Sequence, residues 1–209
     1  AEAEAKTAAT AKDKGGDDLI SLLINQEVDG EKVTEAEFAS LFVQIAVAGN
    51  ETTRGLISSG LYLLAKHPEA YRELEANPDL LPSAVEEMLR WTCPLHYFRR
   101  TATCETELAG QVIAAGDRVV MLYSSANFDE NVFIKPMDFD IHRNPNPHLA
   151  FGYGTHFCRG APLARLEGEV FLRTVMQRFN NLRLNGEVVM EKRIPVLQGI
   201  LKLPVAWDT

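Results

Sequence analysis

Cysteine, an excess of basic charge and long apolar runs are all scarce or missing from this sequence. The three cysteines, Cys93, Cys104 and Cys158, are odd in number, lie far apart and form no Cys-x-x-Cys pair. This spacing predicts neither a disulfide framework nor a zinc site. The net charge of −8 argues against nucleic acid or an anionic membrane surface as a partner. No apolar run approaches the roughly 20 residues of a membrane-spanning helix, and no signal peptide is recognisable. These absences favour a reducing cytoplasm and no membrane association.

What remains is an ordinary globular composition. The 209 residues are 46% hydrophobic and 24% charged, which is enough to bury a sizeable core. Residues 1–16 are low in complexity, rich in Ala, Lys and acidic residues, and we interpret them as a linker or a frayed helix end. The folded part is therefore expected to span residues 17–209.

The pattern of apolar residues predicts a mainly α-helical chain with small β-sheets. Helices are expected at residues 19–24, 34–67, 69–76, 82–91 and 160–179. Strands are expected at residues 97–103, 111–113 and 118–122 and in the tail, with an irregular stretch at 129–150.

Two of these helices carry expectations about burial. The helix that begins with the capping box Thr34–Glu37 runs to His67-Pro68, about 45–50 Å, and is apolar on nearly every side, so we expect it to be buried. The last helix is expected to bury one apolar face. This face consists of Leu163, Leu166, Val170, Phe171 and Val175.

Two polar motifs stand in apolar surroundings. Ala-Gly-Asn-Glu-Thr-Thr, residues 48–53, interrupts the middle of the long helix, where Gly49 costs about 1 kcal/mol relative to alanine and Glu51 needs a partner or water. A functional site and a solvent-facing polar stripe explain this pattern equally well. Glu87-Met-Leu-Arg90 places an acid and a base on one helix face, which is either a surface ion pair or a buried one.

The third motif is Phe-Gly-Tyr-Gly-Thr-His-Phe-Cys-Arg-Gly, residues 151–160. It lacks the third glycine of a dinucleotide fingerprint and the Gly-Lys-Ser/Thr of a phosphate loop. Three interpretations of Cys158 stay open: a nucleophile paired with His156, a buried structural cysteine, and a thiolate ligand of heme iron. The flanking glycines and the helix that follows suit the third, because they allow backbone amides to face an anionic sulfur.

Taken together, the three motifs resemble those of the cytochrome P-450 family of heme-thiolate monooxygenases. Residues 151–160 and the following Ala-Pro-Leu-Ala-Arg-Leu-Glu resemble its cysteine-ligand loop, residues 48–53 its oxygen-activating segment, and residues 87–90 its Glu-x-x-Arg helix. They also occur in the family's order. The resemblance implies heme b (iron protoporphyrin IX) as cofactor and O2 as co-substrate. It implies a small apolar substrate, as in bacterial members that hydroxylate terpenoids, sterols or branched lipids, and an electron-transfer partner such as a ferredoxin with its reductase.

The resemblance also assigns roles to individual residues. Cys158 becomes the axial ligand of the iron, and Glu51 and Thr52 the pair that delivers protons to bound oxygen. Glu87 and Arg90 form a structural triad with Arg143. The remaining positions implied in heme binding are Arg100 and His156 at the propionates, Phe151, Gly152 and Gly160 in the loop, and Ala48 and Gly49 on the long helix. Positions implied to line a substrate pocket are Val47, Ala48, Leu95 and Ile200.

The resemblance runs from about Asp17 to Trp207 but covers only the C-terminal half of the family's length. The chain is therefore expected to be a fragment without the N-terminal half, whose uncovered apolar surface favours a dimer. Two alternatives to a monooxygenase follow: a heme-binding sensor or carrier without turnover, and a non-catalytic truncated domain that does not hold heme alone.

Overall fold

The structure is a computed structural model that describes residues 18–28, 30–197 and 199–208. The expected linker at residues 1–16 lies outside the described residues. The chain divides into two compact units, residues 1–50 and 51–209, and each is described by itself. Helix α3 (Glu35–Lys66) is continuous across the division. The confirmed fold class is mainly helical with small antiparallel sheets.

In the first unit, side chains cap the N-termini of two helices, α2 (Leu19–Ile24) and α3. Helix α2 begins where the Asp18 carboxylate accepts a hydrogen bond from the Ser21 amide. Strands β1 (Glu27–Val28) and β2 (Glu31–Lys32) pair as a hairpin. The capping box at the start of α3 is confirmed: the Glu37 amide donates to Thr34 Oγ1 at 3.3 Å, and the Thr34 amide donates to Glu37 Oε2 at 2.9 Å.

The second unit contains the core. After α3 come α4 (Pro68–Ala76), the 3-10 turn η1 (Pro78–Leu80), α5 (Leu81–Thr92), α6 (Tyr123–Ala126), the 3-10 turn η2 (Gly154–His156) and α7 (Ala161–Arg178). The strands are β3 (Tyr97–Thr101), β4 (Thr106–Leu108), β5 (Gln111–Ile113), β6 (Arg118–Leu122), β7 (Asn180–Leu184), β8 (Val189–Met190), β9 (Ile200–Lys202) and β10 (Val205–Asp208). They pair antiparallel as β3–β6, β4–β5, β7–β10 and β8–β9. Strand β4 was not expected, because Thr-Glu-Leu is short and shows no apolar alternation.

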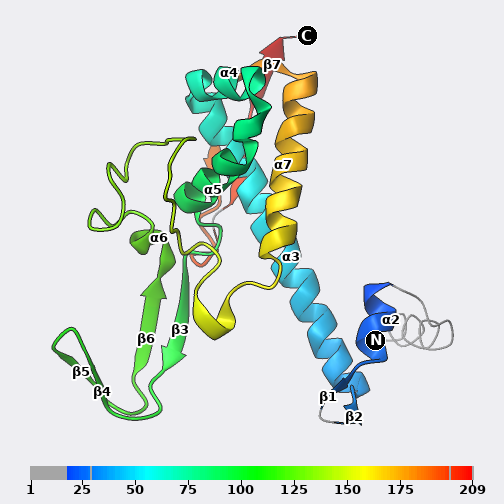
Figure 1. The fold of residues 1–209 in the computed structure, drawn as a ribbon, viewed down its shortest axis with the longest axis vertical. Coiled ribbons are helices and arrows are strands. Elements are labelled where there is room, and N and C mark those ends of the chain that lie inside the picture. The colour runs from blue at the N-terminus through cyan, green and yellow to red at the C-terminus, as the bar shows by residue number, and fades with distance from the viewer. Residues whose placement is uncertain (1–17, 29, 198, 209) are drawn as a thin grey trace. The chain divides into compact units, whose positions relative to one another are not determined.

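Helices α5 and α7 pack against one another. The β3–β6 ribbon follows the C-terminal end of α5 (Figure 1). Between 127 and 160 the chain has little regular structure, as the sequence predicts, and it leads from α6 to the start of α7. Among the residues that the structure describes, none of the helices combines the length and hydropathy that crossing a membrane requires.

Helix α7 shows that one burial expectation is wrong. Leu163, Leu166 and Val170 are exposed, Leu163 to 59%. Val175 is buried as expected, and the other buried residues of the helix are Ala161, Gly168 and Leu172. Gly168 lets α7 approach α5 closely, so the face that contains Gly168 and Leu172, rather than Leu163 and Leu166, is turned to the core.

The first half of α3 also differs from expectation. Phe38 is buried, but the other large apolar side chains of the helix before Asn50 are exposed in the described chain, Val47 to 65%. Leu56, Leu63 and Leu64, in the second unit, are buried. A helix that is apolar on all sides indicates burial only where other elements cover it.

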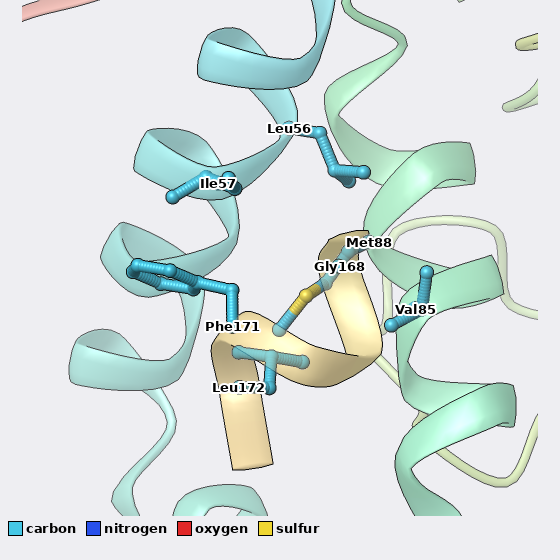
Figure 2. A pocket seen from close by; sticks show the side chains of 7 residues that line it. All are labelled: Leu56, Ile57, Val85, Met88, Gly168, Phe171 and Leu172. Carbon is cyan, nitrogen blue, oxygen red and sulfur yellow. The ribbon is translucent and has the colours of Figure 1, made fainter. Parts of the chain in front are cut away.

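Figure 2 shows where α3, α5 and α7 of the second unit meet around an apolar cavity of about 10 Å³. A cavity this small and apolar stays dry. Its lining comes from α3, α5 and α7 and consists of Leu56, Ile57, Val85, Met88, Gly168, Phe171 and Leu172. Gly168 permits a close approach of α7 to α5, since a Cβ there would lie 3.2 Å from Val85 Cγ1 and 3.4 Å from Val85 Cγ2.

We expect Gly168→Val to lower the free energy of unfolding by about 1–3 kcal/mol, because the added methyl groups find no space between α5 and α7. Gly49→Ala is the matched control. Its Cβ would meet no atom within 4 Å, so it should raise helix stability by about 1 kcal/mol. Urea denaturation of both variants measures the two effects, and shifts of the same sign would contradict the packing argument.

Candidate active site

Cys158 lies in a loop that glycines shape. Gly152 and Gly154 adopt φ angles of 72° and 70°, in the left-handed region that glycine occupies without strain. The Cys158 amide donates to the carbonyl of Phe151 at 3.0 Å, and the Cys158 carbonyl accepts from the Ala161 amide at 3.3 Å. The loop is therefore closed on one side and joined to the first turn of α7 on the other.

Cys158 is exposed, and its sulfur takes part in no disulfide bond. A Cβ on Gly160 would lie 3.8 Å from Cys158 Sγ, so the glycine keeps the space beside the sulfur open. The other two cysteines are in different environments. Cys93 is fully buried, and burial raises the pKa of its thiol to about 12, while Cys104 is an exposed loop residue. Cys93 therefore has the environment of a buried structural cysteine, whereas Cys158 does not, because it is exposed.

The pairing of Cys158 with His156 as a nucleophile gains no support. Within residues 18–28, 30–197 and 199–208 no hydrogen bond joins the two side chains, and no group of three or more His, Cys, Asp or Glu residues could hold a metal ion. Any metal bound by Cys158 would therefore need further ligands from outside these side chains.

Arg100 extends from an exposed position on β3, where it is paired with Val119 of β6. Its Nη1 donates to the carbonyl of Arg99 at 3.0 Å, and its guanidinium carbon lies 5.9 Å from the ring centroid of Phe98. Among the described residues no carboxylate forms an ion pair with it. The guanidinium fork is thus available to an external carboxylate. His156, in η2, is also exposed.

The residues expected on α3 fall on both sides of the division between the units. Ala48 and Gly49 belong to the first unit, and Glu51 and Thr52 to the second. Glu51 forms an ion pair with Arg54, one turn along, with Arg54 Nε 3.0 Å from Glu51 Oε2. Thr52 is partly buried. That these residues meet Cys158 around one cofactor stays a prediction.

The residues expected to line a substrate pocket differ in exposure. Val47 is exposed and Leu95 is partly buried, whereas Ile200 is buried in β9, with 8% of its surface exposed. Ile200 therefore contributes to packing in the second unit rather than to an open surface of it.

The triad of Glu87, Arg90 and Arg143 is confirmed. Glu87 and Arg90 have fully buried side chains, joined by two hydrogen bonds of 2.8 Å. Arg143 Nε donates to Glu87 Oε2 at 3.0 Å, and both arginines donate to the carbonyl of Asp138. The sequence alone left open whether Glu87–Arg90 is a surface pair, and the structure shows that it is buried.

Asn127 is a structural residue that the sequence analysis missed. Its buried side-chain amide donates to the carbonyl of Arg90 at 3.1 Å and accepts from the Leu149 amide at 2.7 Å, while its own carbonyl accepts from Arg90 Nη1. The partners lie 22 and 37 residues away, so no local pattern could have identified it.

A second charged cluster, also missed, lies beside the triad. Glu86 accepts two hydrogen bonds from Arg165, at 2.6 and 2.9 Å, and contacts His148 Nε2 at 3.1 Å. Burial alone would raise the pKa of Glu86, but the hydrogen bonds from His148 and Arg165 outweigh it and hold that pKa at about 2. The sequence signal was weak, because Glu86 stands in an ordinary acidic pair.

This cluster predicts an acid-sensitive contribution to stability. A carboxyl group whose pKa falls on folding stabilises the folded state above its unfolded pKa of about 4.5 and loses that contribution as pH falls toward 2. We expect wild type to exceed Glu86→Gln in free energy of unfolding at pH 7 by up to about 3 kcal/mol, with the difference vanishing between pH 4.5 and 2. Urea titrations of both proteins across that range measure it, and a pH-independent difference would contradict the assignment.

The comparisons with known proteins agree with this architecture. Residues 2–204 match the family described as Cytochrome P450. The chain is 46% identical over 192 residues to a steroid C26-monooxygenase of Mycolicibacterium smegmatis, covering 91% of this chain and 48% of that protein. It is 45% identical over 200 residues to a methyl-branched lipid omega-hydroxylase of Mycobacterium tuberculosis, covering 92% and 45%.

Solved structures give the same result. The cytochrome P450 PksS of Bacillus subtilis superposes with a TM-score of 0.94 at 36% identity, over 100% of this chain and 54% of that one. A Bacillus megaterium protein solved in complex with testosterone gives 0.93 at 33% identity, over 100% and 59%. The glycine-shaped cysteine loop and the buried Glu87–Arg90–Arg143 triad thus occur within a known heme-protein fold. The chain belongs to the cytochrome P450 family, and it spans about half the length of the curated relatives that it matches.

Proposed function

We propose that this chain supplies the cysteine-ligand side of a heme-thiolate monooxygenase that inserts one oxygen atom from O2 into a C–H bond of an apolar substrate. The observation that carries the proposal is the exposed Cys158 thiol, held by backbone hydrogen bonds in a glycine loop at the start of α7. Family membership supports it.

The residues present fit heme b by the chemistry of their donors. Cys158 has no companion side chains with which to complete a metal site within the described chain, and heme brings four nitrogen ligands of its own. Arg100 and His156 are exposed groups suited to the two propionates. Gly160 lies beside the sulfur, Phe151 and Gly152 are further proposed contacts in the loop, and Ala48 and Gly49 are the proposed contacts on α3. When bound, heme would supply the activation of O2, and the Cys158 thiolate would hold its iron and donate electron density to it.

The protein's own groups have separate tasks. Cys158 must lose its proton to bind the iron, and the proposed role of Arg100 and His156 is to fix the orientation of the cofactor through its carboxylates. Glu51 and Thr52 are the proposed route for protons. Glu51 would have to exchange its ion pair with Arg54 to take part, since that pair holds the carboxylate in the present structure.

The relatives support the proposed substrate class. A steroid monooxygenase, a methyl-branched lipid hydroxylase and a structure with bound testosterone favour a small apolar substrate that is steroid-like or lipid-like. An electron-transfer protein, of the ferredoxin type with its reductase, is the proposed source of electrons.

Thr52→Ala tests the monooxygenase against a heme sensor or carrier. In a monooxygenase the variant should consume reductant and O2 at a similar rate but yield several-fold less product, because proton delivery is impaired. The ratio of product formed to reductant consumed, measured with heme-loaded protein, a ferredoxin system and a steroid substrate, reports this. Thr53→Ala, the adjacent position, is the control. An unchanged ratio in Thr52→Ala would contradict the assigned role, and a heme-loaded protein without turnover in any form would favour the sensor.

A further inference from the structure

Phe151 connects the cysteine loop to the charged cluster at Glu86. Its carbonyl accepts the hydrogen bond from the Cys158 amide, and its ring lies 6.2 Å from that of Phe157, edge to face. The guanidinium carbon of Arg165 lies 4.7 Å from the centroid of the same Phe151 ring. A cation at this distance from an aromatic ring attracts it, most strongly where both are partly shielded from water.

Arg165 is itself held in place. Its Nε and Nη2 donate to the two oxygens of Glu86, a fork that fixes the plane of the guanidinium as well as its position. Glu86 is on α5 and Arg165 is on the second turn of α7, so the pair joins the two helices whose packing forms the core. The Arg165 side chain is 35% exposed and that of Glu86 is 28% exposed.

His148 completes the arrangement from the loop side. The Ala150 amide donates to His148 Nδ1 at 3.2 Å, which identifies Nδ1 as the acceptor and places a hydrogen on Nε2. That Nε2–H donates to Glu86 Oε2. The His148 side chain is almost fully buried, and its ring centroid lies 6.0 Å from that of Phe151. Glu86 therefore fixes two groups, Arg165 and His148, that contact Phe151.

We propose that Glu86, His148 and Arg165 are positioning residues for Cys158, which hold the Phe151 ring and, through the Phe151 carbonyl, the backbone of the cysteine. As a role in heme ligation, the inference rests on the proposed function. The adjacent Glu87 does not share this positioning role. It accepts hydrogen bonds from Asp140, Arg143 and Asn146, which precede His148 in the chain. Glu87 fixes the chain between residues 140 and 146. Glu86 fixes His148, in the part of the chain that leads into the cysteine loop.

The test is amide hydrogen exchange in the chain without heme, resolved by NMR at Cys158 and at Asp140. The Asp140 amide donates to Glu87 and is the internal reference. In Arg165→Met the exchange of the Cys158 amide should become about tenfold faster while that of Asp140 stays unchanged. Arg165→Lys keeps the charge but loses the fork, and should restore part of the protection. Arg173→Met, at an exposed position on the same helix, should leave both amides unchanged.

A double-mutant cycle tests whether the effect passes through Phe151. If it does, Arg165→Met should add little to the exchange rate of Cys158 in a Phe151→Leu background. Equal acceleration of Cys158 and Asp140, or additive effects of the two substitutions, would overturn the inference. Because the readout needs no heme, a chain that fails to bind heme would contradict the proposed function and leave this result standing. If Arg165→Met left the exchange rate of the Cys158 amide unchanged in a chain that binds heme, the positioning role would be overturned and the proposed function would stand.

Discussion

Arg90→Met is expected to lower the free energy of unfolding by about 3–5 kcal/mol, which is enough to unfold many domains of this size. The substitution removes the two shortest hydrogen bonds to the fully buried Glu87 carboxylate, both of which come from Arg90. It also removes the Arg90 hydrogen bonds to the carbonyls of Asn127 and Pro136. A buried group that loses its hydrogen-bond partner costs its full desolvation free energy. Most of the effect therefore comes from the partners that stay behind.

The surroundings of Arg90 enlarge this effect. Its guanidinium carbon lies 5.1 to 5.4 Å from the rings of Phe128, Phe133 and Trp91. Arg90→Lys retains a charge among these rings but cannot reproduce the fork, so it should fall between wild type and Arg90→Met.

Arg193→Met provides the comparison. Arg193 also pairs with a glutamate, at 2.7 Å, but its side chain is 78% exposed. Urea denaturation should show a loss below about 1 kcal/mol for this variant. If Arg90→Met and Arg193→Met shifted the midpoint equally, the buried triad would not be a main source of stability.

Cys158→Ser is expected to abolish the red-shifted Soret band of a heme-thiolate protein in the reduced, carbon-monoxide-treated chain after heme reconstitution. Serine keeps the size and shape of the side chain but does not provide a thiolate, so a loss of the band reports on the ligand rather than on folding. The measurement is the absorbance difference spectrum with and without carbon monoxide.

Cys104→Ser is the matched control, since Cys104 is also exposed and lies outside the glycine loop. It should retain the full band. A band that survives in Cys158→Ser would contradict the assignment of the ligand. A chain without any band in unmodified form would support the alternative of a domain that does not hold heme alone.

The sequence predicted the elements whose signals are local. The capping box at Thr34 and the His67-Pro68 stop gave α3 to within a residue at each end, because hydrogen bonds within four residues decide both ends. The resemblance to the family gave the triad of Glu87, Arg90 and Arg143. The roles of Cys158, Arg100 and Thr52 stay predictions.

What the sequence did not predict depends on which surfaces meet. Leu163 and Leu166 have the periodicity of a buried face, but Gly168 permits the closer approach and therefore faces α5. Asn127 and Glu86 act on partners more than 20 residues away. Composition and periodicity contain no record of such distant pairings, and only the folded arrangement reveals them.

The two neighbouring carboxylates of α5 have a consequence for how this chain acquires its structure. Glu87 bonds to partners 53, 56 and 59 residues further along, and Glu86 to partners 62 and 79 residues further along. The irregular stretch from 134 to 150 therefore depends on a helix made much earlier in the chain, and contacts of such sequence separation slow folding because loop closure must precede them. A ribosome would have to release the chain as far as the second turn of α7 before Arg165 could reach Glu86. The same dependence means that this stretch, moved into a related protein, would keep these hydrogen bonds only if α5 were moved together with it.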